Sequence, residues 1–108
     1  MPTNTELLEK KCTPTEIALT EGAITEYLKA VDGWTLTDGK IVKTFAFHNY
    51  YETLAYINAI AYVIHAEDHH PDLAVTYNKC TVRFNTHDVS GISVSDFFCA
   101  SKVDALLV

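Results

Sequence analysis

The sequence contains few of the residues that mark specialised classes of protein. Three of its 108 residues are cysteine, four are glycine and three are proline. Cys12, Cys80 and Cys99 are widely spaced and include no CxxC pair, which excludes a disulfide framework and is typical of free thiols in a reducing compartment. The commoner role of such a cysteine is that of a small buried hydrophobe, and a catalytic thiol is the alternative.

Long apolar runs and clusters of positive charge are absent as well. No apolar stretch approaches the length needed to span a bilayer, and the N-terminus lacks the basic-then-apolar layout of a secretory signal. Fourteen acids against eight bases give a net charge of −6, and the lysines form no stripe that would neutralise phosphates. We therefore expect a cytoplasmic protein with no membrane contact and no direct contact with nucleic acid.

The chain does contain enough apolar surface for one folded domain. Hydrophobic residues make up 48% of it, which is typical of a soluble globular protein. Its length fits a single domain over residues 1–108. The first residues are polar, and we expect about residues 1–15 to be loosely ordered.

Capping residues and hydrophobic spacing predict three helices. Thr20 and Asn49 are placed to cap the first two, and the second helix should fail before Pro71, because the residue preceding a proline resists the helical conformation. Ser93 with Asp96 three residues later resembles a capping box at the start of the third. The predicted helices cover about residues 20–31, 49–70 and 93–106.

Four short strands are predicted between these helices. Asp38-Gly39 is a strong hairpin signal, and Asn78-Lys79 forms a second tight turn. The strands cover residues 34–37, 40–47, 73–77 and 81–86. Short hairpins favour an antiparallel sheet, and the three amphipathic helices must bury one face each. The fold class that satisfies both is a two-layer α+β domain, with three helices packed on one face of a four-stranded antiparallel sheet.

Two polar clusters that contain histidine lie beside apolar segments. His69-His70-Pro71 leaves the second predicted helix, and Asn85-Thr86-His87-Asp88 ends the fourth predicted strand. If that helix packs on the sheet, both clusters reach one edge of the domain, near Asp96. The expected pocket holds three imidazoles and the carboxylates of Asp68, Asp88 and Asp96. Histidine is the side chain best suited to proton exchange near neutral pH.

The residues alone fit three kinds of chemistry. A metal site is one, because His65 and His69 share a helix face and His87 could add a third ligand, although no cysteine or glutamate completes a known pattern. Acid–base catalysis without a cofactor is the second, with carboxylates setting the protonation of each imidazole. A structural role at the helix dipole or at a backbone carbonyl is the third. Three histidines with acidic neighbours favour acid–base catalysis and no metal.

At these residues the chain resembles the pterin-4a-carbinolamine dehydratases. That family carries a histidine doublet and a proline after a helix, then an aromatic residue, a threonine-histidine pair and a later aspartate. The corresponding residues here are His69-His70-Pro71, Tyr77, Thr86-His87 and Asp96, and Trp34 stands where the family has a tryptophan. The resemblance covers about residues 34–103.

The resemblance implies both a fold and a reaction. The fold is an α+β layer with a four-stranded antiparallel sheet, and members assemble as homodimers or homotetramers. The reaction is that of a hydro-lyase, which converts 4a-hydroxytetrahydropterin to quinonoid dihydropterin and water. This recycles the tetrahydrobiopterin cofactor of aromatic amino-acid hydroxylases. The pterin is therefore the expected substrate, and the resemblance implies no cofactor and no metal.

The same resemblance assigns roles to residues. His69, His70 and His87 are the implied catalytic imidazoles; we favour His69 and His87 as the acid–base pair, with His70 holding the substrate. The residues expected to bind the pterin are Asp68, His69, His70, Asn85, Thr86, His87 and Asp88. Trp34, Pro71 and Asp96 are expected to support them by packing or by orienting a histidine, and plain core packing is an equal expectation for Trp34.

Two departures and two alternative functions accompany the resemblance. His65 stands where many relatives carry an acidic residue, and Leu73 stands where an aromatic residue often follows the proline. In some animals, relatives serve as dimerisation cofactors of a homeodomain transcription factor, so a transcription-factor partner is one alternative. The other is a related pterin-binding domain with a different reaction, for example in molybdopterin metabolism.

Overall fold

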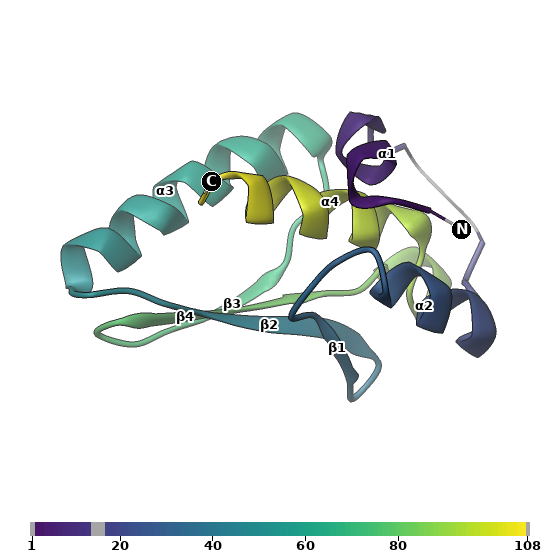
Figure 1. Cartoon of the computed structure of the whole chain (residues 1–108), viewed down its shortest axis with the longest axis horizontal. Coiled ribbons are helices and arrows are strands. Elements are labelled where there is room, and N and C mark those ends of the chain that lie inside the picture. The colour runs from purple at the N-terminus through teal and green to yellow at the C-terminus, as the bar shows by residue number, and fades with distance from the viewer. Residues whose placement is uncertain (1, 14–16, 108) are drawn as a thin grey trace.

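A computed structural model describes residues 2–13 and 17–107 of the chain. Its elements in chain order are α1 (Asn4–Glu9), α2 (Glu21–Leu28), β1 (Thr35–Thr37), β2 (Lys40–Ala46), α3 (Tyr50–Glu67), β3 (Asp72–Val75), β4 (Lys79–Phe84), the 3-10 helix η1 (His87–Val89) and α4 (Val94–Ala105). Figure 1 shows α3 and α4 lying above the sheet, with α1 and α2 near the end where α4 begins.

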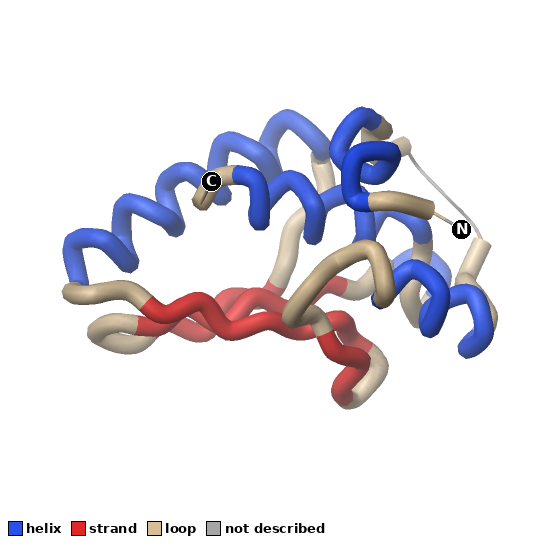
Figure 2. Tube along the Cα trace, viewed as in Figure 1, coloured by secondary structure: helices blue, strands red, loops and turns tan. Residues whose placement is uncertain are grey.

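The four strands form one layer, and α3 and α4 lie over one face of it (Figure 2). The strand order is β1-β2-β4-β3, and every neighbouring pair is antiparallel. Because alternate residues of a strand face the same side, the two central strands bury one row each beneath the helices. These rows contain Ile41, Phe45, Cys80, Val82 and Phe84. The predicted two-layer α+β class is therefore confirmed.

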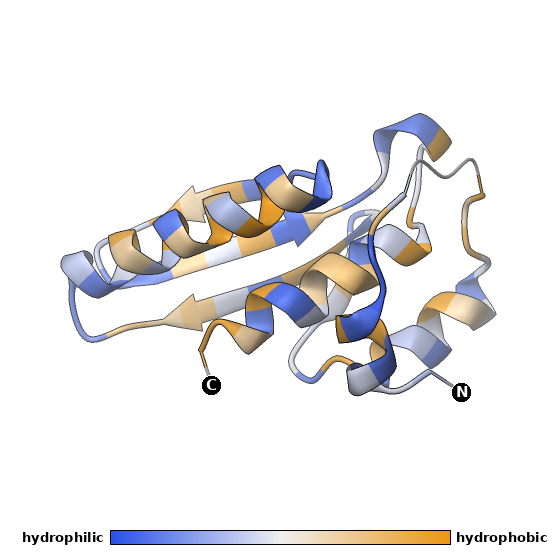
Figure 3. Ribbon diagram, turned by 90° about the horizontal axis from the view of Figure 1, so that it is seen from above, coloured by the Kyte–Doolittle hydropathy of each residue, from blue (hydrophilic) through white to orange (hydrophobic). Residues whose placement is uncertain are grey.

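The long helix and the last helix supply most of the second layer. Seen from above, α3 and α4 lie side by side across the sheet, and each carries both hydrophilic and hydrophobic residues (Figure 3). Ile60 of α3 and Phe97 and Val103 of α4 are completely buried. Within residues 2–13 and 17–107, no helix combines the length and the hydropathy that crossing a bilayer requires.

The helices α2, α3 and α4 each begin directly after the residue that the sequence predicted as the cap. The Thr20 hydroxyl accepts a hydrogen bond from the Ala23 amide, and the Asn49 side chain accepts one from the Glu52 amide. Ser93 and Asp96 form the predicted capping box at the start of α4. These side chains satisfy amides that the first helical turn leaves without a partner.

The second hairpin is longer than the predicted turn. β3 ends at Val75, two residues before the predicted end, and the Thr76 amide donates to the Lys79 carbonyl across the turn. β4 begins at Lys79 and ends at Phe84, so Thr86 lies beyond the strand, where its amide donates to the Gly91 carbonyl. Thr86 and Gly91 form an isolated β-bridge there, outside the sheet. The polar cluster at residues 85–88 therefore lies beyond β4 and not within the strand.

Within the described residues the α-helices number four, whereas the sequence pattern predicted three. The extra one is α1, in the segment that we expected to be loosely ordered; residues 14–16 of that segment lie outside the described residues. Leu7 of α1 is 2% exposed, and Lys102 of α4 donates from Nζ to the Leu8 carbonyl at 2.7 Å. A six-residue helix with one buried apolar residue gives no periodic signal, which is why the pattern missed it.

An aspartate on α4 ties that helix to the sheet. Asp104 accepts hydrogen bonds from the Trp34 indole Nε1 and from Lys43 Nζ, both at 2.9 Å. Trp34 is 4% exposed, so without the Asp104 carboxylate its indole N–H would be buried with no hydrogen-bond acceptor. The Trp34 ring also contacts Phe84, with ring centroids 5.9 Å apart.

Candidate functional site

The end of α3 directs His69 into the interior. Asp68 follows the helix in the left-handed conformation, at φ 52° and ψ 44°. The amides of Asp68 and His69 donate back to the carbonyls of His65 and Ile64. This closure ends the helix in the way that glycine usually does. The chain changes direction at Asp68, and the His69 side chain therefore points toward α4.

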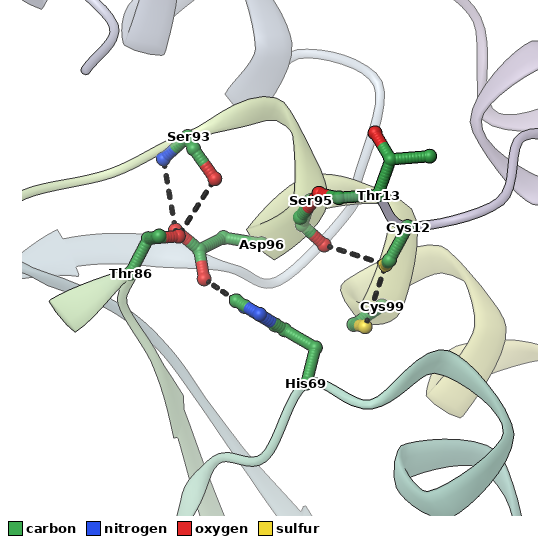
Figure 4. Close-up of polar contacts among 8 residues, drawn as sticks. All are labelled: Cys12, Thr13, His69, Thr86, Ser93, Ser95, Asp96 and Cys99. Carbon is green, nitrogen blue, oxygen red and sulfur yellow. Dashed lines mark hydrogen bonds and ion pairs between the residues drawn. The ribbon is translucent and has the colours of Figure 1, made fainter. Parts of the chain in front are cut away.

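His69 meets a fully buried carboxylate on α4. Its Nε2 lies 2.6 Å from Asp96 Oδ1, the His69 side chain is 14% exposed and that of Asp96 is 0% exposed. The other oxygen, Oδ2, accepts hydrogen bonds from the Ser93 amide at 2.9 Å and from the Thr86 hydroxyl at 2.8 Å (Figure 4). Asp96 thus serves the helix cap and the histidine at once, and its negative charge is held by three donors.

Two opposing effects act on His69. Burial by itself lowers the pKa of the imidazole, because the charged form loses hydration. The hydrogen bond with Asp96 and the charges of Asp96, Cys12 and Asp68 act in the other direction and outweigh it, so the pKa of His69 is raised above its usual value. The His69 ring also stacks on Phe84, with centroids 5.9 Å apart. The site therefore favours a protonated, rigidly oriented imidazole.

The other two histidines form a stacked pair near the surface. The rings of His70 and His87 have centroids 5.9 Å apart and planes 25° apart. Both residues are exposed. His70 leads through Pro71 into β3, and His87 begins η1, so the loop after α3 and the loop after β4 bring them together. All three histidines of the two sequence clusters therefore meet at one edge of the sheet, as predicted.

A cleft of about 180 Å³ lies among these residues. Its lining consists of the seven residues to which the family resemblance assigns pterin binding: Asp68, His69, His70, Asn85, Thr86, His87 and Asp88. Half-buried His69 and the exposed pair of His70 and His87 thus border one space. This arrangement allows proton donation and proton acceptance on the same small molecule.

A second cleft of about 190 Å³ adjoins the first and shares Asp68, His69, Thr86 and Asp88 with it. The remaining residues that line it are Cys12, Thr13, Glu67 and Ser95. The sequence pattern predicted none of these four, because no motif joins the N-terminal segment to the ends of α3 and α4. Only the tertiary structure brings Cys12 there, where its amide donates to Glu67 Oε1 at 2.7 Å.

Three further residues named from the sequence have distinct places. Trp34 lies in the core, where it contacts Phe84, the ring on which His69 stacks. Pro71 is half-buried directly after the histidine doublet, and His65 is exposed on α3 while His69 turns inward. Among residues 2–13 and 17–107, no group of three histidine, cysteine, aspartate or glutamate side chains is arranged to hold a metal ion.

This geometry defines a class of site: a polar cleft that combines imidazoles and carboxylates and is suited to proton transfer on a small polar molecule. The family model for pterin 4 alpha carbinolamine dehydratase matches residues 17–106. The chain therefore belongs to this family, whose members are hydro-lyases.

Individual relatives agree with that membership. A protein of Bdellovibrio bacteriovorus that bears the family's name is 53% identical over 110 residues, covering 98% of this chain and 92% of the relative. One from Nitrosospira multiformis is 46% identical, covering 94% and 92%. A crystal structure of a transcriptional coactivator/pterin dehydratase from Brucella melitensis aligns with a TM-score of 0.79 and 32% identity, over 83% of this chain and 98% of that one.

Proposed function

We propose that the protein removes water from 4a-hydroxytetrahydropterin to give quinonoid dihydropterin, by acid–base catalysis at His69 and His87. The observation that carries this proposal is the cleft in which a half-buried His69, bound to Asp96, faces the same space as His87. The reaction needs two proton transfers. The 4a-hydroxyl leaves as water only when it is protonated, and the N5 proton departs as the C4a–N5 double bond forms.

His69 suits the role of general acid. Its Nε2 is bound to Asp96, so Nδ1 is the ring nitrogen left to exchange a proton with the substrate. The raised pKa of His69 keeps a proton on that nitrogen near neutral pH. Once Nδ1 has given its proton to the leaving hydroxyl, Nε2 still donates to Asp96. The carboxylate therefore holds the ring in one orientation throughout the step.

His87 suits the role of general base. It is exposed and lies on a separate loop from His69, so it approaches the cleft from another side. His70 stacks against His87 and would hold the substrate beside it. The proton that His87 takes from N5 and the proton that His69 gives up are exchanged with solvent between turnovers. No metal and no cofactor enters this scheme.

Polar groups around the cleft match the polar edge of a pterin. The carboxylates of Asp68 and Asp88 are acceptors for the amino and amide N–H groups of the ring, and Asn85 and Thr86 offer both donors and acceptors. We further propose that the protein acts in the cytoplasm as a homodimer or homotetramer and that its product re-enters the cycle of an aromatic amino-acid hydroxylase.

A stopped-flow measurement of 4a-hydroxytetrahydropterin decay, with and without the protein, tests the reaction. His69→Ala and His87→Ala should each lower the catalysed rate by about 10²–10⁴-fold, the usual contribution of a general acid or base. His48→Ala is the matched control. His48 is exposed and precedes α3, whereas His69 follows it, and an 18-residue helix separates the two. Wild-type turnover in the double variant would refute histidine catalysis.

The name of the Brucella melitensis relative supports a second candidate function. That protein is described as a transcriptional coactivator as well as a pterin dehydratase. A pulldown with a dimeric transcription factor as bait distinguishes the two functions for this chain. Binding that survives in the His69→Ala, His87→Ala double variant would show a role independent of the cleft. Rapid dehydration with no capture would leave the enzymatic role alone.

A further inference from the structure

Two thiols from distant parts of the chain meet beside the His69 cleft. Cys12 Sγ lies 3.2 Å from Cys99 Sγ, although 87 positions separate them in the sequence (Figure 4). Cys99 is buried within α4, whereas Cys12 is half-buried and lines the second cleft. Both cysteines are free thiols. The more accessible sulfur is therefore in contact with a protected one.

The segment that carries Cys12 is held in place by bonds other than the thiol contact. The Cys12 amide donates to Glu67 Oε1 at 2.7 Å, and the Lys11 ammonium donates to the Ala66 carbonyl at 3.2 Å. The Ser95 hydroxyl donates to the Thr13 carbonyl at 3.4 Å. These contacts hold residues 11–13 against α3 and α4, so the sulfur–sulfur approach does not depend on a freely moving tail.

We propose that Cys12 and Cys99 form an oxidisable dithiol, which a peroxide converts into an intramolecular disulfide that fastens the N-terminal segment to α4. In this scheme Cys12 is the attacking sulfur, since it lines a cleft open to solvent, and Cys99 is the resolving sulfur. The inference concerns the thiols alone, and it holds whether or not the protein dehydrates a pterin.

The chemistry balances with the peroxide as the two-electron oxidant. The Cys12 thiolate attacks one peroxide oxygen, the O–O bond breaks, and hydroxide leaves, so Cys12 becomes a sulfenic acid. The Cys99 sulfur then loses its proton and attacks the Cys12 sulfur, the S–O bond breaks, and the S–S bond forms. Each departing hydroxide takes up one thiol proton, so hydrogen peroxide and the two thiols give the disulfide and two molecules of water. The thiols are oxidised and the peroxide is reduced.

The electrostatics of the pair suit this division of roles. The hydrogen bond with Cys99 lowers the pKa of Cys12, the charge of His69 and the contact with Ser95 lower it further, and these effects outweigh burial and the charge of Glu67. The same contact, together with burial, raises the pKa of Cys99. A low-pKa, accessible thiol beside a resolving cysteine is the usual arrangement of a peroxide-sensitive pair. Cys80 differs, because burial raises its pKa.

The experiment exposes the reduced, whole protein to a small molar excess of hydrogen peroxide and then quenches it. Free thiols are counted with an alkylating reagent, and digestion with mass spectrometry identifies any cross-linked peptides. Cys12→Ser and Cys99→Ser test the two partners, and Cys80→Ser is the matched control. Thermal unfolding is followed before and after a reductant is added, because a cross-link across so long a loop stabilises the folded state.

The expected result is the loss of two thiols per chain in the wild type and in Cys80→Ser, with a peptide that joins residues 12 and 99. The Tm should rise by about 10 °C and fall back on reduction. Neither Cys12→Ser nor Cys99→Ser should form an intramolecular cross-link. The proposal is overturned if the wild type keeps three free thiols, or if the bond formed involves Cys80 or joins two chains. The wild-type peptide map distinguishes these outcomes even if a variant fails to fold.

Discussion

Replacing Asp96 by asparagine tests the central interaction of the site. Asparagine has the same shape, so its carbonyl oxygen can still accept from the Ser93 amide and the Thr86 hydroxyl. Its NH₂ group must then face His69 and donate to Nε2, which has to give up its proton. The substitution therefore removes the charge that favours the imidazolium and also reverses the tautomer of the neutral ring.

The expected effect on stability follows from the burial of the pair. Asp96 is completely buried and His69 nearly so, at 14% side-chain exposure, and a hydrogen bond between charged groups in such a place contributes about 1.5–3 kcal/mol. At about 4 °C per kcal/mol for a domain of this size, Asp96→Asn should lower the Tm by roughly 6–12 °C in mildly acidic buffer. Asp32→Asn changes the same charge at an exposed site, and we expect it to leave the Tm almost unchanged.

The contribution of His69 to the stability of the folded protein depends on pH, and the sign of this dependence is definite. The pKa of His69 is raised in the folded protein, so its stabilising contribution is complete below the unfolded value of about 6.5 and is lost as the pH rises through the folded value. The difference in Tm between wild type and Asp96→Asn should therefore shrink as the pH rises from mildly acidic to alkaline values, through the raised pKa of His69. Thermal denaturation across this range measures it.

The rate of catalysis gives an independent test of the effect of Asp96→Asn. If His69 is the acid, Asp96→Asn should lower turnover by about 10²-fold or more, because the protonated ring is no longer favoured. The basic limb of the pH–rate profile should also move to lower pH. Wild-type turnover with an unchanged pH profile, in a variant that folds, would refute the reasoning about this pair. A circular dichroism spectrum checks that α4 still forms.

Other predictions address the parts of the structure around the site. Leu7→Ala should lower the free energy of unfolding by about 2–5 kcal/mol, as truncation of a buried side chain does. Leu8→Ala should change it little, since Leu8 is 39% exposed. Equal effects of the two variants in denaturant titrations would contradict the packing of α1. Asp104→Ala leaves the Trp34 indole without its acceptor and should cost about 1–3 kcal/mol, seen as a lower urea midpoint. Thr86→Val removes a hydroxyl bound to Asp96 and should cost a similar amount; an unchanged midpoint would argue against that bond.

Local sequence determined most of the secondary structure and the two histidine-containing clusters that border the first cleft. Thr20, Asn49 and Ser93 have side chains that satisfy the amides of a first helical turn, so each marks a helix start without any knowledge of the rest of the fold. The histidine doublet before Pro71 and the cluster at residues 85–88 were recognisable for a related reason. Their residue types and spacing are sufficient to suggest a proton-transfer site, and the antiparallel fold brings the two ends together.

Only the tertiary structure decided which side chains act on which. The sequence placed His69 and Asp96 near one another, but the 2.6 Å bond depends on the left-handed turn at Asp68, where asparagine or glycine is more usual. The N-terminal segment could not be predicted from a pattern, because a short helix with one buried leucine has no periodicity. Its contacts with α3 and α4 pair residues more than fifty positions apart, such as Cys12 with Glu67 and with Cys99. Long-range contacts of this kind depend on how the layers pack, and no local rule encodes them.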